Sequence, residues 1–89
     1  IYVDEGAAQA MCGNASLLPV GVTRVEGTFR AGDAVGVCNQ DGRELARGIV
    51  DYSSDELEAV KGMRSGQVAQ VLSHASPDAI HRDYLVLVE

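Results

Sequence analysis

Alternating apolar and polar residues, broken by glycine-containing turns, fill the middle of the chain over residues 16–48. An apolar entry segment at 17–22 contains Pro19, which cannot donate to a sheet ladder, so this segment is predicted to be a loop or a sheet edge. Strands are then predicted over residues 23–29, 34–38 and 43–52. Two successive hairpins would make an antiparallel meander, so the expected core is a small β-sheet or barrel.

Turns are predicted between these strands, at residues 30–33 and 39–42. Gly32 and Gly42 can supply the positive φ angles that tight turns need, and Asp41–Gly42 is a strong local hairpin signal. Both glycines are therefore expected to shape turns and not to take part in chemistry.

Helices are predicted on both sides of the meander. Asp4 can cap a first helix at its amino end, and Gly13 is expected to end that helix. Ser53 and Glu56 have the spacing of a capping box for a second helix, which Gly62 should end.

The last third of the chain should add a further helix and a strand. Val68, Val71 and Leu72 recur at helical spacing and predict a short helix within residues 63–72. A final strand is predicted over residues 79–88. Its unbroken apolar run at 85–88 should have both faces covered by the core or by a neighbouring domain.

Acidic residues outnumber basic ones 13 to 7, which gives a formal net charge of −6. Nucleic-acid affinity depends on Lys and Arg side chains that neutralise phosphates, so this balance disfavours RNA binding. The first 23 residues contain Asp4 and Glu5 but no Lys or Arg. The length fits one domain, residues 1–89, and no apolar run approaches the roughly 20 residues of a membrane span. Because the chain opens on the strand-like triplet 1–3 without a Met, we expect a fragment of a larger protein.

Candidate chemical groups are few. A zinc site would have to combine two cysteines and two histidines, Cys12, Cys38, His74 and His81. These residues lack the closely paired ligands typical of closed zinc sites, and buried reduced thiols are the favoured interpretation. Residues 81–83 read His-Arg-Asp, as in the catalytic loop of protein kinases, but the Asn required five positions later is absent. No phosphate-binding G-x-x-x-x-G-K-[ST] pattern occurs, so no catalytic, cofactor-binding or metal-ligating residue is assigned.

Several segments resemble, in order, a PUA domain, the small RNA-binding-type module named after pseudouridine synthases and archaeosine transglycosylases. They are VDEGA (3–7), SLLPVGV (16–22), GTFRAGDAV (27–35) and ARG (46–48). YSSDEL (52–57), KGMRS (61–65) and IHRDYLVL (80–87) further resemble the C-terminal PUA domain of bacterial glutamate 5-kinases. The resemblance implies a mainly β, α+β fold, in which a small mixed or antiparallel pseudo-barrel is flanked by two or three short helices.

The same resemblance implies an accessory role in a larger enzyme. Glutamate 5-kinases transfer the γ-phosphate of ATP to the side-chain carboxylate of L-glutamate, which opens proline biosynthesis in the bacterial cytoplasm. Their ATP, Mg²⁺ and glutamate sites lie in an N-terminal amino-acid-kinase domain that this sequence lacks. We therefore expect a non-catalytic regulatory or assembly domain without its own cofactor. Its expected partners are the kinase domain and other copies in a homo-oligomer, and no membrane.

Two candidate surfaces follow. In RNA-binding PUA domains the glycine loop after the first helix approaches the RNA backbone, and the corresponding residues here are Gly13, Asn14 and Ser16. The chain also has more apolar side chains than a small barrel can easily hide. An interdomain or oligomer contact is accordingly expected at Leu17, Leu18, Val20, Leu85 and Leu87. The alternatives are an RNA-binding PUA domain of a tRNA- or rRNA-modifying enzyme, which the charge disfavours, and a β-barrel for a small ligand or metal, which no motif supports.

Overall fold

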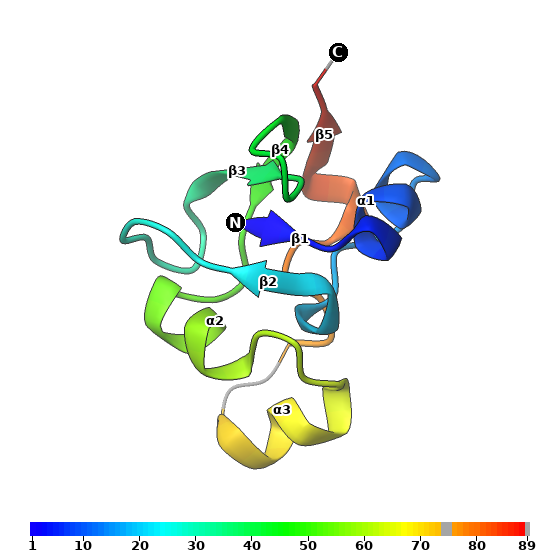
Figure 1. The fold of residues 1–89 in the computed structure, drawn as a ribbon. Helices are drawn as coiled ribbons and strands as arrows, with labels where there is room; N and C mark the ends of the chain where they lie inside the picture. Colours follow the sequence, from blue (N-terminus) through cyan, green and yellow to red (C-terminus); the bar gives the residue numbers. More distant parts are fainter. Residues whose placement is uncertain (74–75, 89) are drawn as a thin grey trace.

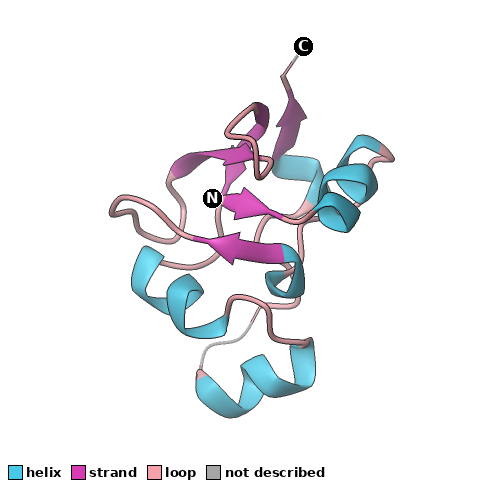
Figure 2. Cartoon of the chain, viewed as in Figure 1, coloured by secondary structure: helices cyan, strands magenta, loops and turns pink. Residues whose placement is uncertain are grey.

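Five short strands form one mixed sheet in the order β2-β1-β3-β4-β5, and three short helices lie around it (Figure 1). The computed structural model describes residues 1–73 and 76–88. The strands are β1 (Tyr2–Val3), β2 (Val22–Arg24), β3 (Ala34–Cys38), β4 (Glu44–Ile49) and β5 (Leu85–Leu87). The helices are α1 (Glu5–Cys12), α2 (Ser54–Val60) and α3 (Ser65–Val71), with 3-10 turns η1 (Pro19–Gly21) and η2 (Arg82–Tyr84). Figure 2 shows the strands grouped together and the helices at the periphery, so the predicted α+β fold is confirmed.

The two-residue strand β1 lies in the middle of the sheet. It pairs antiparallel with β2, where Val3 is opposite Val22, and parallel with β3, where Tyr2 is opposite Cys38. The Cys38 N–H donates to the Ile1 carbonyl at 2.8 Å and continues this ladder. Because β1 separates β2 from β3, the predicted first hairpin and the three-stranded meander are wrong.

The predicted strand over residues 23–29 stops early, because its second half leaves the sheet. Gly27 adopts a φ of 79°. Beyond it, the Phe29 N–H donates to Ser54 Oγ at 3.1 Å, and the Phe29 carbonyl accepts from the Ser54 N–H at 3.0 Å. These bonds attach the segment to the first turn of α2 and leave its backbone unavailable to β3.

The hairpin between β3 and β4 is confirmed, although β4 is shorter than the predicted 43–52. Asn39 Oδ1 accepts from the N–H groups of Asp41 and Arg43, both at 3.0 Å, and Gly42 has a φ of 86°. Gly32 also takes the expected positive φ, at 96°, and its N–H donates to the Val50 carbonyl at 2.7 Å. The turn at residues 30–33 therefore extends the β3–β4 ladder and does not close a hairpin with β2.

The predicted helix caps are present at both amino ends. Asp4 Oδ1 accepts from the Ala7 N–H at 2.7 Å and begins α1. Ser53 and Glu56 form a reciprocal capping box at the start of α2. Gly13 ends α1 as predicted, but its φ is −88°, and the left-handed conformation typical of a helix end is taken by Asn14 at 72°. The third predicted helix is confirmed as α3, and Gly62 follows α2 with a φ of 76°.

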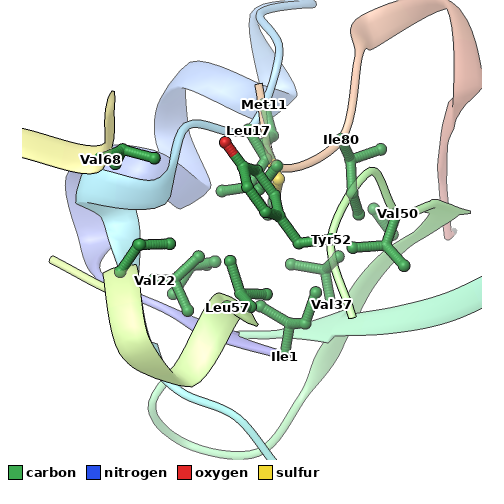
Figure 3. Close-up of a cluster of buried hydrophobic side chains, with 14 residues drawn as sticks. Ile1, Met11, Leu17, Val22, Val37, Val50, Tyr52, Leu57, Val68 and Ile80 are labelled. Carbon is green, nitrogen blue, oxygen red and sulfur yellow. The ribbon is translucent and has the colours of Figure 1, made fainter. Parts of the chain in front are cut away.

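Tyr52 lies at the centre of the buried cluster that the sheet and helices enclose (Figure 3). Its side chain is fully buried, and its hydroxyl donates to the Ser76 carbonyl and accepts from the Ser76 N–H at 2.8 Å. The other large, fully buried side chains are Met11, Leu17, Leu57, Ile80, Val3, Val22, Val37, Val50, Val60 and Val68.

The predicted final strand is reduced to β5, because residues before it take other conformations. Ile80 makes an isolated antiparallel bridge with Leu17, whose N–H donates to the Ile80 carbonyl at 2.9 Å. His81 Nδ1 then accepts from the Asp83 N–H at 3.1 Å and caps η2, which interrupts the extended chain. Residues 85–87 pair with β4, the Val88 N–H donates to the Leu45 carbonyl at 2.8 Å, and β5 forms one edge of the sheet.

Replacing Gly32 or Gly42 with alanine should lower the free energy of unfolding by roughly 1–2 kcal/mol each, because an L side chain resists the left-handed region. A Cβ at either position would meet no atom within 4 Å, so the cost should be conformational and not steric. Gly66→Ala in α3 is the matched control, since Gly66 has equally open surroundings without a positive φ. Urea denaturation measures the difference, and equal stability of all three variants would contradict these turn assignments.

Tyr52→Phe should lower the free energy of unfolding by about 1–3 kcal/mol at neutral pH, because Ser76 loses the partner of both backbone groups. Burial raises the pKa of Tyr52 above its ordinary value of 10.0. The folded state therefore holds this proton more tightly than the unfolded state. The contribution is complete below pH 10.0 and is lost as pH rises through the folded pKa.

The stability difference between the parent chain and Tyr52→Phe should consequently narrow above pH 10.0. Urea titrations of both chains at neutral and alkaline pH measure it. A difference that stays constant or widens would show that Tyr52 is not the group whose ionisation opposes folding.

Candidate functional site

The loop after α1 holds the three residues predicted as an RNA-type face, and all three have structural roles. Gly13 donates its N–H to the carbonyls of Gln9 and Ala10, and Asn14 reverses the chain. Ser16 Oγ accepts from the Arg82 N–H at 2.9 Å, across 66 positions of sequence. This bond places the exposed Arg82 beside the loop, a proximity that sequence spacing could not reveal.

Three of the seven basic side chains pair with acidic residues away from this loop. Arg24 lies 3.0 Å from Glu26 and also stacks over the Tyr2 ring, with its guanidinium carbon 4.0 Å from the ring centroid. Arg47 pairs with Glu44 at 2.8 Å, and Lys61 pairs with Glu58. The other arginines come from four separate segments, at Arg30, Arg43, Arg64 and Arg82. An RNA backbone at the loop after α1 would therefore find little of the cationic surface that such binding needs.

The apolar entry segment divides between core and surface. Leu17 is fully buried, so its predicted place in a contact surface is wrong. Leu18 and Val20 flank the buried Pro19 and remain 45% and 42% exposed. We call this exposed pair the 18/20 ridge.

Two hollows border the 18/20 ridge. One, of about 240 Å³, lies between the ridge and the small residues Gly6, Ala7 and Ala10 of α1. The other, of about 400 Å³, lies between the ridge and residues before α3, including Met63. The ridge and its hollows form an uneven apolar surface against which side chains of another protein could pack.

Two contacts hold the ridge in place. A Cβ at Gly21 would lie 2.5 Å from the Ala7 Cβ, so the glycine permits close packing of η1 against α1. On the other side, the Gly62 N–H donates to the Pro19 carbonyl at 2.8 Å. The ridge is therefore supported by both α1 and the end of α2.

The sheet edge at β5 is a second exposed apolar surface. Leu85 is partly buried against the core, whereas Leu87 is 44% exposed and Val86 is 69% exposed. We predicted that both faces of the apolar run at 85–88 are covered. Among these four residues, this chain itself partly covers Leu85, whereas the other three side chains are exposed. Tyr84, Val88 and Ile49 add exposed apolar area nearby.

The candidate chemical groups do not assemble into a reactive or metal-binding site. Cys12 is exposed and Cys38 is partly buried, so the interpretation of both as buried thiols is wrong for Cys12. His74 lies outside the described residues. Within residues 1–73 and 76–88, no three His, Cys, Asp or Glu side chains are arranged to hold a metal ion. Asp4 is occupied as a helix cap, and the His-Arg-Asp triplet at 81–83 forms the capped turn before β5.

No helix in the described part of the chain combines the length and the apolar character needed to cross a bilayer. The surfaces predicted from the sequence are thus the 18/20 ridge, the β5 edge and the loop after α1.

Comparison with known proteins identifies the type of module. The family profile described as "PUA domain" matches residues 1–72. Two solved structures resemble the fold. A conserved PUA domain protein from Thermoplasma acidophilum has a TM-score of 0.65 at 19% identity, covering 99% of this chain and 46% of that protein. A PUA domain from Aeropyrum pernix, in complex with tartrate, has a TM-score of 0.64 at 28% identity, covering 91% of this chain and 41% of that one.

Curated relatives are enzymes much longer than this chain. It is 53% identical over 90 residues to a glutamate 5-kinase from Microcystis aeruginosa and 50% identical over 91 residues to one from Synechocystis. A glutamate 5-kinase from Aquifex aeolicus is 40% identical over 87 residues. These alignments cover 98–100% of this chain but only 24% of each relative, so the chain spans about a quarter of their length.

The two neighbouring leucines provide a direct test of the surface assignment. Leu17→Ala should lower the free energy of unfolding by about 2–5 kcal/mol, because it opens a cavity in the core. Leu18→Ala should change it by about 1 kcal/mol or less, because the side chain is 45% exposed and leaves no enclosed cavity. Urea denaturation of both variants checks this contrast. Similar losses in the free energy of unfolding would contradict the assignment of Leu18 to the surface.

Proposed function

The chain belongs to the PUA domain family, and we propose that it is the C-terminal PUA domain of a glutamate 5-kinase, where it acts as a regulatory or assembly module. The observation that carries this proposal is the 40–53% identity to glutamate 5-kinases over almost the whole chain. In such an enzyme, the transfer of phosphate from ATP to L-glutamate would take place in a separate kinase domain in the cytoplasm. ATP and Mg²⁺ would bind there.

The local chemistry supports a role that depends on contacts. The sequence has no phosphate-binding loop, and the described residues offer no cluster of metal ligands. A module without chemistry affects a linked enzyme only if it makes different contacts in two states of the assembly. Its apolar surfaces are the places where such a difference can arise.

The 18/20 ridge is the preferred contact with the kinase domain or with a second subunit. Leu18 and Val20 are exposed, yet their backbone is held between α1 and α2. Apolar side chains presented by a fixed backbone lose little conformational entropy when they are covered. The β5 edge is the second contact surface, through Leu85 and Leu87.

RNA binding is the weaker alternative, because sharing a fold with RNA-binding PUA domains does not by itself imply the same function. The net charge of −6 and the absence of Lys and Arg from residues 1–23 argue against affinity for a phosphate backbone. A fluorescence titration with tRNA at physiological salt distinguishes the two roles, because sub-micromolar affinity would favour the RNA-binding one.

In the full-length kinase, deleting residues 1–89 should leave the catalytic turnover number largely intact. The same deletion should change the inhibition by proline, the Mg²⁺ dependence or the oligomeric state, because the contacts of this domain are lost. Steady-state kinetics with a proline titration and light scattering measure these properties. Complete loss of turnover in a well-folded truncation would mean that the domain completes the active site, which the proposal denies.

The double variant Leu18→Ser/Val20→Ser should reproduce the effect of the deletion in the full-length kinase. Val71→Ser is the matched control, because Val71 is 49% exposed on α3 and lines neither hollow of the ridge. If the double variant keeps the proline inhibition, Mg²⁺ dependence and oligomeric mass of the wild-type enzyme, the ridge is not the surface that contacts the kinase domain or a second subunit.

A further inference from the structure

A groove lies between α1 and the turn that joins β3 to β4, away from the 18/20 ridge. We call it the helix–turn groove, and its volume is about 710 Å³. From α1 it is lined by Glu5, Ala8, Gln9 and Cys12, and from the β3–β4 hairpin by Asn39, Gln40, Asp41 and Leu45.

The two walls of the groove are held by local hydrogen bonds. The Asn39 side chain accepts from the Asp41 and Arg43 N–H groups, which fixes the backbone of the turn. On the helix, Gln9 Nε2 donates to Glu5 Oε1 at 3.4 Å, one turn away. The carboxylates of Glu5 and Asp41 therefore project from backbones that are already ordered.

The floor and the rim of the groove differ in chemistry. Ala8 and Leu45 are partly buried and pack against the core, so the floor is apolar. The rim carries the exposed residues Glu5 and Asp41 and the amide oxygens of Gln9 and Gln40. Neither Glu5 nor Asp41 forms an ion pair with any described residue, whereas Glu26, Glu44 and Glu58 each do.

The groove therefore has negative charge, and none of its described lining residues is a Lys or an Arg. We propose that it binds an arginine side chain carried on an extended segment of a protein partner. The aliphatic stem of the arginine lies on Ala8 and Leu45, as long basic side chains commonly cover apolar surface. The guanidinium group lies between the carboxylates of Glu5 and Asp41 and donates to the amide oxygens. This proposal does not depend on the kinase assignment.

Competing ligands fit the groove less well. A phosphate or a nucleic-acid backbone has the same sign of charge as the rim. Cys12 also lines the groove, but no three His, Cys, Asp or Glu side chains within residues 1–73 and 76–88 are arranged to hold a metal ion. A purely apolar segment would leave both carboxylates without a counter-charge.

The test is a titration of the ¹⁵N-labelled 89-residue chain with the blocked tripeptide glycyl-arginyl-glycine, followed by amide chemical shifts. Saturable shifts are expected at Ala8, Gln40 and Leu45. The same peptide with citrulline in place of arginine should bind much more weakly, because citrulline keeps the shape of the side chain but has no charge.

The double variant Glu5→Gln/Asp41→Asn should weaken binding of the arginine peptide by about fivefold, since two partly solvated charge pairs are lost. Asp55→Asn/Glu58→Gln on α2 is the control, because it removes the same charge outside the groove. Its affinity should match that of the parent chain. Absence of saturable shifts, equal binding of the citrulline peptide, or an equal loss in the control variant would each overturn the proposal.

Discussion

The pairing of β1 with both of its neighbours is the interaction on which the rest of this domain depends. Two residues connect β2 to β3, and Val3 carries a fully buried side chain into the core. The next residue, Asp4, caps α1 with its side chain, and the Asp4 N–H donates to the Gly21 carbonyl at 3.0 Å. One short segment therefore sets the sheet order, the start of α1 and the position of η1. Both the 18/20 ridge and the helix–turn groove are built on these elements.

Local features could be predicted from the sequence because neighbouring residues determine them. The Asp41–Gly42 turn and the Ser53–Glu56 capping box formed as predicted, since each closes within four residues. The position of β1 could not be predicted, because two residues carry no detectable period and their partners lie about 20 and 36 positions away. The assumption that successive strands pair therefore produced a meander that does not exist.

The candidate surfaces could be predicted only in part, because burial of a side chain also depends on partners far away in the sequence. An apolar run does not show which of its side chains are buried, and only in the folded chain is Leu17, bridged to Ile80, fully buried while Leu18 is exposed. Arg82 meets Ser16 across 66 positions, and the helix–turn groove joins α1 to a turn nearly 30 residues later. The resemblance of ordered motifs gave the family, whereas the fold was needed to decide which residues a partner can reach.

Amide hydrogen exchange is the most direct test of the claim that this domain acts through a contact surface. The comparison is between the 89-residue chain alone and an intact glutamate 5-kinase that carries it. The amides of Leu18, Val20 and Gly21 should exchange more slowly in the intact enzyme, because a partner surface covers the 18/20 ridge, while α3 should exchange equally in both. Equal exchange of these three amides in the two proteins would contradict the account, since the ridge would then be as exposed to water in the enzyme as in the isolated domain.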